Sequence, residues 1–211
     1  PSDPAMLPAF NAGRYKWVEF HKWMFDARYY LPLDNKKKLV LEAKAHFGFI
    51  GSYTKEAGIG PFERFFLGGD GLAGGFNSFL LGQEIIGLRG YENNKVTPPL
   101  YNKHNTGAST GGTVQGGIVY DKLGLELRYP VTTGNAATIY GFVFTEAGNN
   151  WGNYENFDPF KLYKSAGIGA RIFMPAFGLI GLNWAYGFDR VPGMQDVSGS
   201  QFQFTIGNQL R

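Results

Sequence analysis

Apolar and polar residues alternate with a period of two along most of the chain, which predicts strands with one oily and one polar face. Seven such segments are bounded by clusters of Gly, Pro, Asn or Asp. They lie at residues 17–31, 38–49, 117–129, 137–147, 161–174, 177–188 and 200–210. Helical periodicity is nearly absent, so the pattern predicts an all-β, antiparallel fold.

The length of the segments and the content of their polar faces favour a membrane barrel over a soluble sandwich. Soluble strands usually have about five or six residues, whereas about 9 to 11 residues cross a bilayer on a tilt. A hydrated lumen tolerates charges that a dry sandwich core does not. The polar faces carry Asp26, Arg28, Glu42, Lys44, Glu126, Arg128 and Arg171. Aromatic residues near strand ends suit an interfacial girdle, namely Trp151, Tyr154 and Phe157.

Composition agrees with this interpretation. Aromatic residues make up 17% of the chain and charged residues only 18%, below the roughly 25% of ordinary soluble domains. No apolar stretch approaches the roughly 18 residues of a spanning helix, so any crossing is made by strands. The formal charge of +3 is spread along the chain, which does not support binding of nucleic acid. A soluble sandwich acting as a binding module remains the alternative.

Seven strands do not close a barrel, because bacterial single-chain barrels have an even number of strands, at least about eight. We therefore expect further strands outside this chain. A long Gly-rich connection separates the second and third strands, at about residues 51–116. It is far longer than ordinary loops, so it is either disordered or functional.

Tests for catalytic and metal-binding motifs find no candidates. His21, His46 and His104 lie far apart without acidic or cysteine residues at ligand spacing. The Gly-rich run at residues 67–75 lacks the Gly-Lys-Ser/Thr ending of a phosphate-binding loop, and no nucleophile elbow is present. We expect no enzymatic activity, no cofactor and no metal.

Two motifs in the long connection resemble the sixth extracellular loop of the BamA family, the outer-membrane assembly factors of the bacterial surface antigen superfamily. They are the sequence PFERFFLGGD at residues 61–70 and GLRGYE at residues 87–92. The similarity continues through LELRYP at 125–130, FTEAGN at 144–149, SAGIG at 165–169 and FQFTIG at 202–207. The resemblance implies that residues 1–211 are the C-terminal portion of a transmembrane antiparallel β-barrel of about sixteen strands, incomplete in this chain, with the loop folded into the lumen.

The resemblance also implies a site. Arg89, Gly90 and Tyr91 would form the loop tip, with Arg89 held by Glu126 and Glu146 on neighbouring strands. Glu126 alternates with leucines and should therefore point inward. Glu146 shares its face with Tyr140, Phe142 and Phe144, an ambiguous set, and is assigned inward by its carboxylate and by the family match. Arginine suits this position because its planar fork bridges carboxylates.

The function implied by the resemblance is assembly and insertion of outer-membrane β-barrels in Gram-negative bacteria, by lateral opening and strand templating at the seam between the first and last strands. The seam strand would contain Phe202, Phe204, Ile206 and Gly207, with Gly207 as a kink. Expected partners are outer-membrane lipid, nascent outer-membrane proteins, the remaining strands and periplasmic domains of the same polypeptide, and assembly-complex subunits. The alternatives are a two-partner secretion or autotransporter-assembly barrel, and a passive porin.

Overall fold

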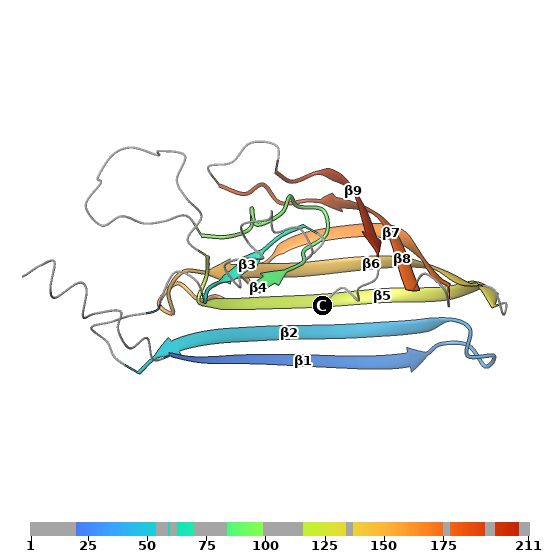
Figure 1. The fold of residues 1–211 in the computed structure, drawn as a ribbon, viewed down its shortest axis with the longest axis horizontal. Helices are drawn as coiled ribbons and strands as arrows, with labels where there is room; N and C mark the ends of the chain where they lie inside the picture. The colour runs from blue at the N-terminus through green and yellow to red at the C-terminus, as the bar shows by residue number, and fades with distance from the viewer. Residues whose placement is uncertain are drawn as a thin grey trace, which may run out of the picture.

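The computed structural model describes residues 20–53, 59, 63–69, 84–98, 116–133, 137–174, 178–192 and 197–206. Their main feature is a seven-stranded antiparallel sheet in the order β1-β2-β5-β6-β7-β8-β9, shown in Figure 1. The strands are β1 (Phe20–Pro32), β2 (Val40–Ser52), β5 (Val119–Thr133), β6 (Thr138–Trp151), β7 (Tyr163–Met174), β8 (Gly178–Gly187) and β9 (Ser200–Ile206). All seven predicted strands are confirmed. No helix in the described part of the chain is long and apolar enough to cross a membrane.

The long connection contains structure that the sequence did not predict. Two short strands, β3 (Phe65–Leu67) and β4 (Glu84–Ile86), pair in parallel. The residues of β3 are all buried, and β3 contacts β5 and β6 of the main sheet. Phe65 exchanges backbone hydrogen bonds with Gly117, at 2.9 and 2.7 Å, just before β5 begins. This part of the loop is therefore docked onto the sheet.

The outer face of the sheet is apolar and exposed, as the alternation predicts. Such a continuous band is costly in water and suits contact with lipid. Its members include Trp23, Phe25, Tyr29, Leu123, Leu125, Val143, Ile168, Trp184, Tyr186, Phe202 and Phe204. One expected girdle residue is an exception, because Trp151 is only 6% exposed and packs against Phe157. Trp151 still lies on the outer side of the sheet, because it pairs with Val119, which pairs with the outward-facing Phe49. It is covered there by residues that follow β6.

The segment predicted to end at residue 129 continues in the structure through Pro130 to Thr133, the end of β5. The pairing register with β6 shifts between Pro130 and Thr132. A proline has no N–H for the ladder, and a bulge is one of the few places in a sheet that accepts it. The irregular pairing explains why the strand extends past this residue.

The inner face divides into an apolar zone and a charged zone. In the apolar zone, loop and sheet share one hydrophobic core, made of Ile50, Phe65, Leu67, Ile86, Leu88, Tyr91, Val96, Tyr120, Val191 and Val197. The charged zone lies on β2, β5, β6 and β7 and is described below. Aromatic rings from neighbouring strands cover inward-facing glycines, since a Cβ on Gly167 would lie 2.6 Å from the Phe144 ring.

We predict that Gly167→Ala destabilises the sheet by about 1–3 kcal/mol, the usual cost of overpacking. The added methyl group would also lie 2.2 Å from the carbonyl oxygen of Trp184, a backbone atom that cannot rotate away. Gly124→Ala is the matched control, because its nearest neighbour is 3.8 Å away. The measurement is the urea midpoint of unfolding in lipid vesicles. Equal midpoints for the two variants would contradict the prediction.

Candidate functional site: the loop tip and the ionic cluster

Three carboxylates are buried on the inner face of the sheet, on three adjacent strands. Glu42 of β2, Glu126 of β5 and Glu146 of β6 are each no more than 5% exposed. Glu42 and Glu126 are directly opposite each other in the register of β2 and β5. Like charges placed opposite each other destabilise a sheet, and a buried carboxylate needs a cationic partner. This arrangement therefore requires positive charge from elsewhere.

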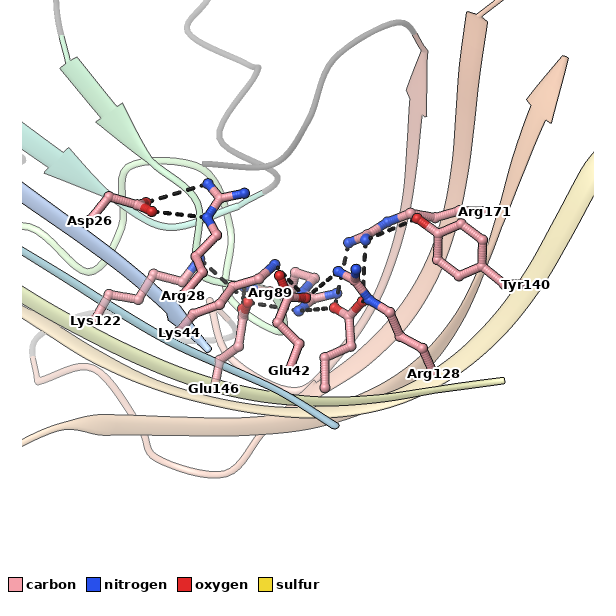
Figure 2. Close-up of polar contacts among 11 residues, drawn as sticks. Asp26, Arg28, Glu42, Lys44, Arg89, Lys122, Arg128, Tyr140, Glu146 and Arg171 are labelled. Atoms are coloured by element: carbon pink, nitrogen blue, oxygen red, sulfur yellow. Dashed lines mark hydrogen bonds and ion pairs between the residues drawn. The ribbon is translucent and has the colours of Figure 1, made fainter. Parts of the chain in front are cut away.

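Arg89 of the loop tip supplies part of this charge. Its Nη2 lies 2.7 Å from Oε1 of Glu146 and 3.3 Å from Oε2 of Glu126. Its backbone N–H also donates to Oε2 of Glu146, at 3.0 Å. Figure 2 shows Arg89 on the concave side of the sheet, among charged side chains that rise from the strands. The contact expected from the sequence is present, with Glu126 and Glu146 both pointing inward.

Four further cations complete what we call the ionic cluster. Its members are Glu42, Lys44, Arg89, Lys122, Glu126, Arg128, Glu146 and Arg171. Arg128 and Arg171 approach Oε1 of Glu126 at 2.6 and 3.2 Å, and Arg128 also pairs with Glu42. Lys122 lies 3.3 Å from Glu146. The alternation of the sequence places Lys44, Arg128 and Arg171 on the polar face but does not predict partners for the four cations.

The aromatic residues of β6 take part in the same site. Arg89 lies over the ring of Phe144, with its Cζ 3.4 Å from the ring centroid. Arg171 lies over Phe142 at 4.7 Å and over Tyr140 at 5.9 Å. A guanidinium group is attracted to the negative face of a ring, most strongly where water is excluded. The aromatic residues that made the inward face of β6 ambiguous are thus contacts of the arginines.

Gly90 is where the loop backbone touches the sheet. It has φ of +90°, and an added Cβ would lie 2.8 Å from the backbone nitrogen of Gly187 in β8. A Cβ on Gly187 would in turn lie 2.3 Å from the carbonyl oxygen of Gly90. Only glycine is compatible with both the positive φ and this close approach. The docking geometry therefore requires glycine at position 90, the middle residue of the loop tip.

Tyr91 attaches the loop tip to the end of the β7–β8 pair. Its side chain is fully buried, and its hydroxyl donates to the carbonyl oxygen of Lys164 at 2.7 Å and accepts from the N–H of Asp189 at 3.3 Å. Burial raises the pKa of Tyr91 to about 12. The neutral hydroxyl, which can donate, is the form that the docked loop favours.

The loop tip also contacts the chain that leads into β9. Tyr91 forms an isolated antiparallel bridge with Ser198, and the N–H of Glu92 donates to the carbonyl oxygen of Val197 at 2.9 Å. Val197 and Ser198 are separated from the start of β9 by Gly199 alone. The loop is therefore joined by backbone hydrogen bonds to the entry of the last strand.

Within the described residues β9 pairs only with β8, so its other edge is free. The N–H of Gly187 donates to Gly199 at 3.0 Å, and the register continues as Ala185↔Gln201 and Asn183↔Gln203. Hydrogen-bonded and non-hydrogen-bonded pairs alternate in an antiparallel ladder. The backbone groups of Phe202 and Phe204 therefore point to the free edge. Ile206 ends the strand, and the predicted kink at Gly207 lies outside the described residues, as does His104.

An open antiparallel sheet with an apolar outer face, a charged inner face and a long inward loop is part of the wall of an outer-membrane barrel. The model of the Omp85 superfamily domain matches residues 9–210, and the chain belongs to that superfamily, whose barrels reside in outer membranes.

The fold is similar to that in the crystal structure of BamA from Haemophilus ducreyi lacking POTRA domains 1–3. The TM-score is 0.61 at 20% sequence identity, over 89% of this chain. The chain spans 34% of that chain's length. The sheet thus matches part of the BamA barrel and is not closed in this chain.

We predict that Arg89→Ala releases the loop from the sheet. Removing one partner of a buried ion pair costs about 3–5 kcal/mol, because the remaining carboxylates are left without compensation. Arg89→Lys should restore only part of the docking, since an ammonium group makes a point contact. The measurement is hydrogen exchange of residues 84–98. Arg28→Ala is the control, because Arg28 pairs with the partly exposed Asp26 and exposed pairs contribute little.

We predict that Tyr91→Phe abolishes the weakening of loop docking that ionisation of Tyr91 causes at high pH. The folded-state pKa of Tyr91, about 12, lies above the ordinary value of 10.0, so its contribution is complete below pH 10 and is lost as pH rises through 12. Hydrogen exchange of the loop measured from pH 9 to 12 should show this loss in the parent and not in the Phe variant. Identical profiles would contradict the assignment.

Proposed function

We propose that this chain is the C-terminal wall of a barrel that assembles and inserts β-barrel proteins in the Gram-negative outer membrane, with residues 51–116 as an extracellular loop folded into its lumen. The observation that carries the proposal is the free edge of β9 next to a loop fixed by Arg89. Membership of the Omp85 superfamily supports it. The role is one of templating and is not enzymatic.

The chemistry of the edge explains why such a strand would act as a template. Unpaired N–H and C=O groups are costly in lipid, several kcal/mol for each group left unsatisfied. The edge groups of Phe202 and Phe204 are satisfied when another strand adds beside them. In a closed barrel that neighbour is the first strand of the same polypeptide. Lateral opening of this seam would offer the edge to a nascent strand instead.

The docked loop contributes by holding the entry of β9 in place. Arg89 is fixed to β5 and β6, Tyr91 to the ends of β7 and β8, and Glu92 to Val197. These contacts position the start of the last strand independently of its outer neighbour. The seam can then open without loss of the strand's own register with β8. Kinking at Gly207 would assist this opening.

Site-specific crosslinking in cells tests the proposal. We predict that a photo-crosslinking residue at position 202, at the edge strand, captures nascent outer-membrane proteins during their assembly. The same residue at position 143 is the matched control, because Val143 is also outward-facing but lies on β6, which is paired on both sides. A passive pore would give no capture at either position. Depletion of the protein without any defect in barrel assembly would contradict the proposal.

A further inference from the structure

A cavity of about 370 Å³ lies where the loop tip meets the free edge of β9. Its lining combines the loop and the strand: Tyr91, Glu92, Asn93, Gln201, Phe202, Gln203 and Phe204. The side chains of Phe202 and Phe204 are exposed on the outer face, so these residues reach the cavity through their edge-pointing backbone. The cavity therefore adjoins the free edge of β9 on its inner side, where an added strand would lie.

Two polar groups of the cavity, the side chains of Glu92 and Gln203, are hydrogen-bond acceptors. Glu92 provides a carboxylate on an exposed residue, and Oε1 of Gln203 is buried without a hydrogen-bond partner in the described structure. A buried acceptor without a donor is unfavourable by about 1–3 kcal/mol. None of the lining residues is a lysine, arginine or histidine. Among the described residues the cavity thus has acceptors and negative charge but no cation, unlike the ionic cluster.

The register fixes which side chains of an added strand reach the cavity. Side chains on a strand alternate between the two faces of the sheet, and paired residues of neighbouring strands share a face. Residues paired with Gln201 and Gln203 would therefore point to the concave side, next to Glu92. Residues paired with Phe202 and Phe204 would point to the lipid.

We propose that this cavity receives an inward-pointing lysine or arginine side chain of a client strand added to the free edge of β9. The inference rests on the proposed function and goes beyond it, because it assigns a sequence preference to the templating edge. The ammonium or guanidinium group would donate to the carboxylate of Glu92 and to Oε1 of Gln203. Charge complementarity selects this occupant, and an acidic residue at the same position would be repelled.

The test uses the full-length protein in lipid vesicles with a photo-crosslinking residue at position 201. The probes are synthetic ten-residue strand peptides with aromatic and polar residues in alternation. They are identical except that the central polar position is lysine, norleucine or glutamate. We expect capture of the lysine peptide to exceed that of the glutamate peptide by roughly fivefold, the size of an exposed ion pair and its reversal.

A charge reversal makes the result specific to the cavity. Glu92→Lys should invert the order, so that the glutamate peptide is captured best. Glu155→Lys is the matched control, an equally exposed change on the β6–β7 connection, and should leave the parent order unchanged. Hydrogen exchange confirms that the variants retain the docked loop.

The outcomes separate the inference from the proposed function. Equal capture of all three peptides leaves templating intact and overturns the preference for a cation. Absence of capture for every peptide overturns both. Crosslinks to the protein's own polypeptide in place of the peptides would assign the cavity to a strand of the same barrel, which also overturns the inference.

Discussion

Burial of three carboxylates on one face of a sheet is the constraint on which the rest of the site depends. Glu42 and Glu126 are opposed in register, so β2 and β5 tolerate their pairing only while arginines lie between and beside them. Arg89 differs from the other cations because it comes from the loop and not from the sheet. A local electrostatic requirement of the wall thus determines where a distant segment of the chain lies.

Two different environments meet in this single sheet. The outward side chains present rings and aliphatic groups, as lipid requires, while the inner face carries both a hydrophobic core and the ionic cluster. The core is built like that of a soluble domain, with Phe65 and Leu67 of the loop packed between strands. The apolar contacts remove loop side chains from water, and the charged contacts give the loop a defined position.

The sequence was sufficient for the main sheet because alternation is a local signal that each strand carries independently. The inward direction of Glu126 followed from its leucine neighbours for the same reason. β3 and β4 were missed because three buried residues in a Gly-rich segment show no period. The burial of Trp151 was not predicted because it depends on contacts with Phe157 and Leu162, which follow β6 in the chain and which alternation does not describe. Pairing of Arg171 with Glu126 depends on the register and curvature of β5, β6 and β7, which no single strand encodes.

The contact between Gly90 and Gly187 has a consequence for how the loop can move. Where backbone meets backbone, no side chain has to change rotamer when the surfaces separate or meet again. Departure of the loop tip breaks the ion pairs of Arg89 with Glu126 and Glu146. It also withdraws Leu88 and Tyr91 from the core that the loop shares with the sheet, so both kinds of contact oppose it. The glycine contact itself adds no rotamer barrier to this movement, and the strength of the joint is set by the neighbouring ion pairs and apolar contacts.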